Sequence, residues 1–197
     1  MTNGEREDHP APGRLAVIQD LANSFDQRRG RDDLATRDDA ARWLHEHGIA
    51  GSAKPLTADD LATFHELRAA LRGLLLANNG QENRGEDLAV VDRVVRDSGL
   101  RPRLGPNGQV EVEVPAGGFL ASLAWIVAIV LEAAFAGTWN RLKACPEDAC
   151  NYAFYDRSKN RSRTWCAMAR CGSRVKMRSY RARRLDRGPA SAAAQRR

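Results

Sequence analysis

Apolar residues recur at helical spacing near the start of the chain. They are Leu15, Ile18, Leu21 and Phe25. Residues at this spacing share one side of an α-helix, and a helix buries its apolar side against a neighbour. The pattern therefore predicts an amphipathic first helix that begins at Leu15.

Two further predicted helices begin with the same local signal. Thr36 and Thr57 are each followed within three residues by a pair of aspartates, which is typical of an N-cap with acidic residues in the first turn. The first of these helices carries Trp43 and Leu44 and is expected to end near Gly48. The second stops at Asn78-Asn79-Gly80, and its apolar face consists of Leu61, Phe64, Leu67, Leu71 and Leu74.

The pattern then changes from helical spacing to alternation. Leu88, Val91 and Val95 indicate one more helix, which ends at Gly99. The turn signal Pro106-Asn107-Gly108 follows, with residues 100–104 before it and the alternating run 110–114 after it. This arrangement predicts a two-stranded hairpin, in which Pro102 makes the first strand an edge strand.

The most apolar stretch is Phe119–Ala136. Its 18 residues approach the length of a membrane span, but Ser122 and Glu132 interrupt it. A helix that is apolar on nearly all sides is expected at the centre of a helical domain. We therefore predict a buried central helix and no membrane association.

All four cysteines lie in one 27-residue stretch, as two pairs with four residues between the members of each pair: Cys145 with Cys150, and Cys166 with Cys171. Two such pairs can supply the four thiolates of a tetrahedral structural zinc site. Two disulfides or unliganded core cysteines are the alternatives. The polar segment Met1–Gly13 does not indicate export, so a reducing, cytoplasmic location is expected and disulfides are disfavoured.

Charge divides the chain into two parts. Residues 141–197 hold 16 Lys and Arg against 4 Asp and Glu, whereas residues 1–140 hold 15 against 21. A basic segment beside a metal site favours a polyanionic partner, because Lys and Arg release counterions condensed on nucleic acid. Double-stranded DNA is the first candidate, and the protein is expected to be nucleoid-associated.

The cysteine region can be divided further. Cys145-Pro146 begins a knuckle, Tyr152 to Tyr155 form a strand, and Arg163-Thr164-Trp165 return as a second strand. Ser173 is the predicted N-cap of a basic helix, on which Met177 and Tyr180 are expected to pack against the hairpin. Phe154 and Trp165 are likewise expected in the small core. The predicted DNA contacts are Arg161, Arg163, Arg174, Lys176, Arg178, Arg181, Arg183 and Arg184, of which Arg174, Arg178 and Arg181 form one row.

These residues resemble the CGNR zinc finger. The resemblance rests on Cys145-Pro146, Phe154-Tyr155-Asp156, Ser158-Lys159-Asn160-Arg161, Trp165-Cys166 and Cys171-Gly172-Ser173-Arg174. Ser173 stands where the family has Asn, and both residue types favour a helix N-cap. The upstream region is similar to the ABATE-type domain of bacterial putative stress-induced transcription regulators, chiefly through Asp20-Leu21-Ala22-Asn23-Ser24. The resemblance implies a transcription regulator with Cys145, Cys150, Cys166 and Cys171 as zinc ligands.

We therefore expect a mainly α-helical protein. Residues 14–140 form a helical domain with a small β-hairpin, residues 141–187 form a treble-clef-like zinc finger of knuckle, β-hairpin and basic helix, and residues 1–13 and 188–197 are disordered tails. The helical domain either senses a small-molecule effector, which we favour, or mediates assembly as a homodimer.

Two other classes of function stay open. The finger could bind RNA or a protein, since treble-clef modules serve several partners. The helical domain could be an enzyme that the finger targets, but the sequence has no Gly-rich phosphate loop, no His-Glu-x-x-His run and no nucleophile elbow. We expect the protein not to be an enzyme.

Overall fold

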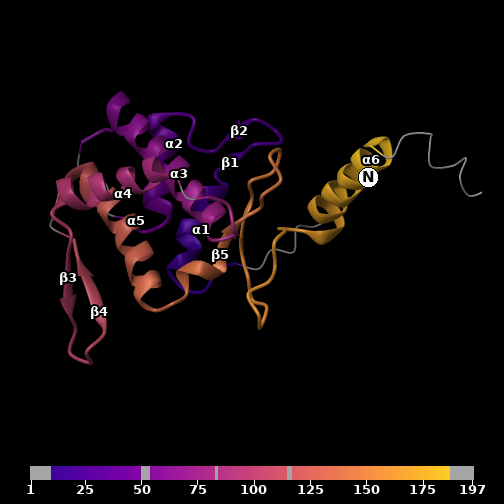
Figure 1. The fold of residues 1–197 in the computed structure, drawn as a ribbon. Helices are drawn as coiled ribbons and strands as arrows, with labels where there is room; N and C mark the ends of the chain where they lie inside the picture. The colour runs from indigo at the N-terminus through magenta and orange to yellow at the C-terminus, as the bar shows by residue number, and fades with distance from the viewer. Residues whose placement is uncertain (1–9, 50–53, 83, 115–116, 187–197) are drawn as a thin grey trace, which may run out of the picture.

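The computed structural model describes residues 10–49, 54–82, 84–114 and 117–186. Within these ranges the fold is mainly helical, with three two-stranded antiparallel hairpins (Figure 1). A helical body contains α1 (Leu15–Asn23), α2 (Arg37–Glu46), α3 (Ala58–Ala77), α4 (Gly85–Ser98) and α5 (Gly118–Phe135). The predicted tails fall mostly outside the described ranges, but Ala11 is buried and its N–H donates to Gln19 at 2.6 Å.

The predicted helix starts and stops are largely confirmed. Thr36 and Thr57 each form a complete capping box with the aspartate three residues later, which satisfies N–H groups that the first turn leaves free. Helix α4 ends at Gly99, whose φ of +64° is a left-handed conformation that suits glycine. Phe25 is an exception, because α1 ends at Asn23 and Phe25 begins a strand.

Helices α3 and α5 supply much of the core. Leu67, Leu71 and Leu75 of α3 are fully buried, as are Ile126 and Val127 of α5. Helix α5 is long and apolar enough to cross a membrane by length and composition, but 56% of it is buried among the other elements. This burial fits the prediction of a central core helix.

The predicted hairpin is present as β3 (Arg101–Leu104) and β4 (Val110–Glu113), which pair with Arg101 opposite Glu113 and Leu104 opposite Val110. Strand β4 packs on α5, and the turn of the hairpin extends away from the body (Figure 1). Gly108 at the turn has a φ of +73°, as the turn signal requires.

A second hairpin, which was not predicted, consists of β1 (Phe25–Asp26) and β2 (Arg31–Asp32). Two arginines of α3 hold it. The Arg68 guanidinium pairs with both carboxylate oxygens of Asp32, with Nη2 to Oδ2 at 2.8 Å, and Arg72 donates to the carbonyl of Phe25 at 2.7 Å. These charged contacts replace the apolar helical packing that was expected for Phe25.

The third hairpin corrects the predicted finger topology. The strand that follows the first cysteine pair is β6 (Ala153–Tyr155), and it pairs with β5 (Leu142–Ala144) rather than with residues 163–165, which are not a strand. Strand β5 is completely buried, and β5 and β6 pack on α3 and α1. Leu142, Ala144, Ala153 and Tyr155 therefore belong to the core of the helical body.

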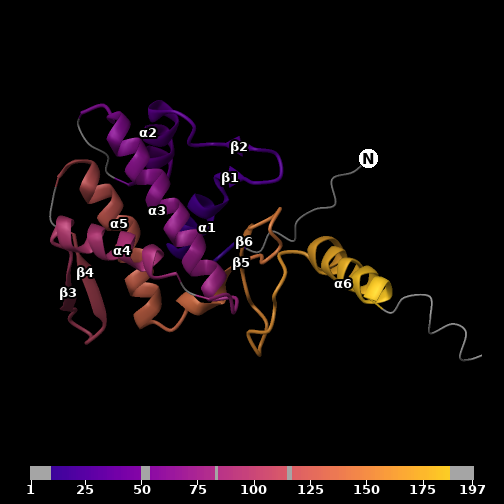
Figure 2. The ribbon, with the colours of Figure 1, turned by 45° about the horizontal axis from the view of Figure 1, so that its top comes forward.

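The last elements are the 3₁₀ turn η1 (Trp139–Arg141), the π-helical turn η2 (Met168–Gly172) and the helix α6 (Ser173–Asp186). Because η2 runs directly into α6, Ser173 is the first residue of the helix and not its N-cap. Its hydroxyl donates to the carbonyl of Met168 at 3.1 Å. Helix α6 stands away from the helical body in both views (Figures 1 and 2).

We predict that Leu123→Ala destabilises the protein by about 2–5 kcal/mol, because it opens a cavity where α5 is fully packed. Urea unfolding followed by circular dichroism measures the change. Leu120→Ala is the matched control on the same helix, since Leu120 is exposed and its loss should cost about 0.5 kcal/mol or less. Equal costs for the two variants would contradict the central position of α5.

Candidate metal centre and nucleic-acid interface

The four cysteines meet at one point between the β5–β6 hairpin and the start of α6. Their sulfur atoms all lie within 4.8 Å of one another. The Sγ atoms of Cys150 and Cys166 are 3.5 Å apart, and those of Cys166 and Cys171 are 3.6 Å apart. Tetrahedral zinc with bonds of about 2.3 Å separates its sulfurs by about 3.8 Å. The sulfur positions therefore fit a four-thiolate metal site.

A tight turn brings the first two cysteines together. The Cys150 N–H donates to the carbonyl of Glu147 at 2.7 Å, and the Cys145 N–H donates to the carbonyl of Tyr152 at 3.0 Å. The backbone N–H groups of Glu147 and Tyr152 in turn hydrogen-bond to the sulfurs of Cys145 and Cys150. This is the predicted knuckle, in which backbone N–H groups point at the thiolates.

The electrostatics of the cluster favour a bound cation. None of the four cysteines forms a disulfide. Hydrogen bonds from Cys145 and Cys166 lower the pKa of the Cys150 thiol, whereas the same contact with Cys150 raises the pKa of Cys145 to about 12. One thiolate therefore suppresses ionisation of its neighbours. All four can ionise together only when a metal ion offsets their charge.

A small apolar cluster surrounds the sulfurs. Phe154 and Ala167 are buried with Cys145, Cys166 and Cys171. Trp165 is partly buried and packs against the same cluster. The predicted core packing of Phe154 and Trp165 is therefore confirmed. The hollow beside Cys150 and Cys166 has a volume of about 10 Å³, which leaves room for one water molecule at most. A closed site of this kind suits a structural metal rather than a catalytic one.

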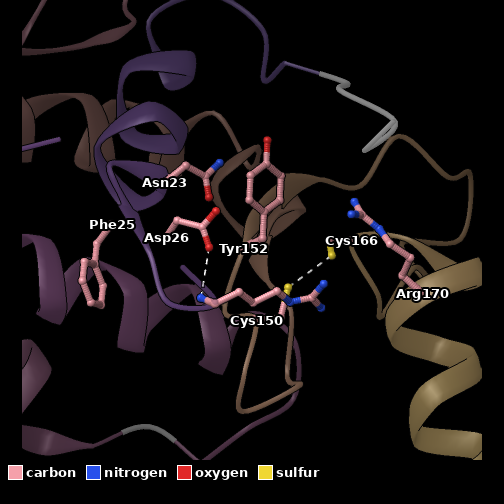
Figure 3. Close-up of a pocket in the computed structure, with 8 residues that line it drawn as sticks. Asn23, Phe25, Asp26, Cys150, Tyr152, Cys166 and Arg170 are labelled. Carbon is pink, nitrogen blue, oxygen red and sulfur yellow. Dashed lines mark hydrogen bonds between the residues drawn. The ribbon is translucent and has the colours of Figure 1, made fainter. Parts of the chain in front are cut away.

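The helical body contributes residues to this site that the sequence analysis missed. Figure 3 shows Cys150 and Cys166 with their sulfurs facing each other, with Phe25 and Asp26 of the β1–β2 hairpin nearby. From the turn of that hairpin, Arg28 Nη2 lies 3.0 Å from the Cys171 sulfur and Arg28 Nε donates to the carbonyl of Ala149 at 3.2 Å. No local sequence pattern indicated that Arg28 approaches residues more than 120 positions away.

A buried ion pair organises the loop between the two cysteine pairs. Lys143 Nζ lies 2.7 Å from the carboxylate of Asp156, which also accepts hydrogen bonds from the N–H and hydroxyl of Ser158 and from the Arg163 N–H. Burial opposes ionisation of Asp156, but the hydrogen bonds from Lys143 and Ser158 outweigh it and hold the pKa of this carboxyl below its usual value. Lys143 also donates to the carbonyls of Arg161 and Arg163. These side-chain contacts take the place of the predicted return strand.

Three asparagines attach the hairpin to the body. Asn23 pairs with both backbone groups of Ala153, at 2.8 Å to its N–H and 3.0 Å to its carbonyl, as a neighbouring strand would. Asn78 donates to the carbonyls of Trp139 and Leu142, and Asn79 donates to those of Ala144 and Thr164. The finger is therefore hydrogen-bonded to α1 and to the end of α3.

Helix α6 touches the knuckle through one ion pair. Both terminal nitrogens of Arg178 contact the carboxylate of Glu147 at 3.1 Å, and Glu147 is only 3% exposed. These hydrogen bonds raise the pKa of the Arg178 guanidinium. Met177 and Tyr180 are 53% and 55% exposed. The expectation that these two residues pack on the hairpin is therefore wrong, because α6 stands away from it (Figures 1 and 2).

The predicted DNA-binding residues fall into two groups. Arg161, Arg163 and Arg178 have partners within the protein: Arg161 donates to the Asn140 side chain at 3.2 Å, and Arg163 donates to the carbonyl of Trp165 and lies over the Phe154 ring. The other predicted residues are exposed on α6, namely Arg174, Lys176, Arg181, Arg183 and Arg184.

Two regions of the chain match known families. Residues 15–137 match ABATE, described as a putative stress-induced transcription regulator, and residues 141–184 match the CGNR zinc finger. No curated protein matches the chain. The second match contains all four clustered cysteines, which suit a structural zinc ion.

We predict that Asp156→Asn lowers the stability of the zinc-loaded protein by about 3–5 kcal/mol, because Lys143 stays buried without a counter-charge. Denaturant unfolding measures the loss. Because the folded-state pKa of Asp156 is lowered, its contribution is fully present above about pH 4 and is lost as the pH falls further. The control, Asp148→Asn, alters an exposed carboxylate of the same region. Equal stability of the two variants would contradict the role of Asp156.

Proposed function

The chain belongs to the ABATE family, described as putative stress-induced transcription regulators, and we propose that it binds duplex DNA through helix α6. The observation that carries this proposal is a basic helix held by a four-cysteine cluster and projecting from the body (Figure 2). We assign regulation rather than catalysis to the protein. The reduced thiols that such a cluster needs favour a cytoplasmic location. DNA binding would place the protein at the nucleoid.

Charge supports DNA as the partner. The sequence of α6 from Ser173 to Arg184 contains six Lys or Arg residues and no acidic residue. Each cation that approaches a phosphate releases condensed counterions, which favours binding to any polyanion. Arginine can also pair with guanine through two hydrogen bonds in the major groove, which would add sequence recognition.

The surroundings of Arg178 suggest which face of α6 meets DNA. Arg174 and Arg181 share the face of Arg178, which lies beside the carboxylates of Glu147 and Asp148. Phosphates would be repelled there. The opposite face carries a second row at positions i, i+4 and i+7, formed by Lys176, Tyr180 and Arg183. We propose that this outward row enters or borders the groove and that Arg178 mainly orients the helix.

Zinc is proposed to make this presentation rigid. Cys145, Cys150, Cys166 and Cys171 would be its ligands, and Cys171 lies two residues before α6 begins. Metal binding to such sites contributes on the order of 10 kcal/mol of coupled folding free energy. A helix that is already ordered also pays less entropy when it binds.

The helical body is proposed to sense a small polar molecule. A hollow of about 340 Å³ lies between the body and the finger, within the usual range for ligand sites. Its lining includes Asp20 and Asp33, the stacked pair of Trp43 and His47, and Tyr152 from the finger. A molecule bound there would contact both regions and could change how the finger is held.

The first experiment selects bound duplexes from a random pool with zinc-loaded protein. For the selected sequence, we predict that Lys176→Ala/Arg183→Ala weakens binding on the order of tenfold and reduces the salt dependence by about two counterions, because two phosphate contacts are lost. Titrations at several salt concentrations measure both effects. A palindromic selected site would indicate a dimer.

The matched control is Arg174→Ala/Arg181→Ala. It removes the same charge from the inward face, which is the face of α6 that carries Arg178, and it should weaken binding less. A larger loss in this control would place DNA on the inward face. Unchanged affinity in both double variants would rule out α6 as the contact. Tighter binding of structured RNA than of duplex DNA at the same salt concentration would favour an RNA-binding module instead.

For the sensing role, we predict that a polar molecule raises the melting temperature of the wild-type protein, because at a hundredfold excess over its Kd it adds about 2.7 kcal/mol of stability. Thermal-shift screening identifies the molecule. Tyr152→Ala should remove its effect, whereas Arg84→Ala, at a separate hollow, should retain it. If no molecule shifts the melting temperature, sensing is excluded and a role in assembly is favoured.

A further inference from the structure

One cation of the helical region lies against the sulfurs of the zinc finger. Arg28 is at the turn of the β1–β2 hairpin, between Asp26 and Arg31. Its Nη2 is 3.0 Å from the Cys171 sulfur, and its Nε donates to the carbonyl of Ala149, directly before Cys150. A single guanidinium therefore contacts one ligand of the second cysteine pair and the backbone carbonyl next to a ligand of the first pair.

Side-chain hydrogen bonds fix the hairpin that carries Arg28, both within its turn and against α3. The side chain of Asp26 accepts the Arg28 N–H at 3.0 Å and the Arg29 N–H at 3.3 Å, which fixes the turn. At the other end of the hairpin, Asp32 pairs with Arg68 of α3 through two hydrogen bonds. Arg28 therefore lies at the turn of a hairpin whose second strand is anchored to α3.

The chemistry of a four-thiolate site explains why a guanidinium belongs there. Four thiolates around one zinc ion leave a net charge of about −2, which is costly in a buried position. Hydrogen bonds to ligating atoms orient them and offset this charge, and losing such a partner typically weakens metal binding on the order of 10–100-fold. The fixed fork of arginine can donate to a sulfur and a carbonyl at once, which the single ammonium of lysine does less well.

We infer that Arg28 is a positioning residue of the zinc centre, so that the ABATE region completes the outer shell of a metal site whose four ligands all lie in the finger. Metal retention is then coupled to the position of the β1–β2 turn. Displacement of this turn would remove the hydrogen bond from Arg28 to the sulfur of Cys171, the ligand two residues before α6. The inference depends on zinc binding and not on DNA binding, and its test is made without DNA.

The experiment compares zinc release from three full-length, zinc-loaded proteins: wild type, Arg28→Gln and Arg29→Gln. Excess 4-(2-pyridylazo)resorcinol captures the metal, and its absorbance gives the rate. We expect Arg28→Gln to release zinc about tenfold faster than wild type. Arg29→Gln removes a neighbouring charge of the same turn that is exposed and pairs only loosely with Asp26, at 3.9 Å, and it should match the wild type.

Thermal melting separates positioning from a purely structural role. In the zinc-free proteins, Arg28→Gln should melt at the same temperature as Arg29→Gln, and only in the zinc-loaded proteins should it melt lower. Equal zinc release by the two variants would overturn the inference, and so would an equal loss of melting temperature with and without zinc. If Arg28→Gln does not fold, Arg28→Lys replaces it: release faster than from Arg29→Gln supports the inference, and equal release overturns it.

Discussion

The arrangement of the C-terminal region depends on four cysteine sulfurs held within 4.8 Å of one another. Thiols this close cannot all ionise by themselves, because each thiolate raises the pKa of the thiols that donate to it. A zinc ion removes this conflict and joins the knuckle after β5 to the turn before α6. The apolar cluster around the sulfurs is small, with Phe154 as its largest buried side chain, so the metal replaces most of the packing that fixes an ordinary helix.

The metal does not act on an isolated module. Strands β5 and β6 place Leu142 and Tyr155 in the core of the helical body, and Asn23 and Asn79 bind the hairpin backbone from α1 and α3. Hydrophobic burial therefore fixes one end of the finger relative to the body, while the sulfurs fix the other end relative to α6. The hairpin and its knuckle therefore form the connection between the body and the start of α6.

The sequence predicted the parts of the structure that short-range chemistry determines. Thr36 and Thr57 marked helix starts, Gly99 marked a helix end, and the cysteine spacing identified the metal cluster. It did not predict contacts made by residues far apart. Leu142–Ala144 is too short to be recognised as a strand, and its partner was assigned to Arg163-Thr164-Trp165 because strand propensity does not specify which strands pair. No pattern indicated a role for Arg28, and Asn79 was assigned only to the end of a helix, since their partners lie 143 and 65 positions away.

The separation of charge gives the projection of α6 its significance. Residues 1–140 have an excess of acidic side chains, and residues 141–197 have a large excess of basic ones. A polyanion is repelled by the first part and attracted by the second, so an approach that keeps the body at a distance is favoured. Helix α6 meets this requirement because it extends away from the body (Figures 1 and 2). The Arg178–Glu147 ion pair joins this helix to the knuckle, which is why we propose that it orients the other cations of α6.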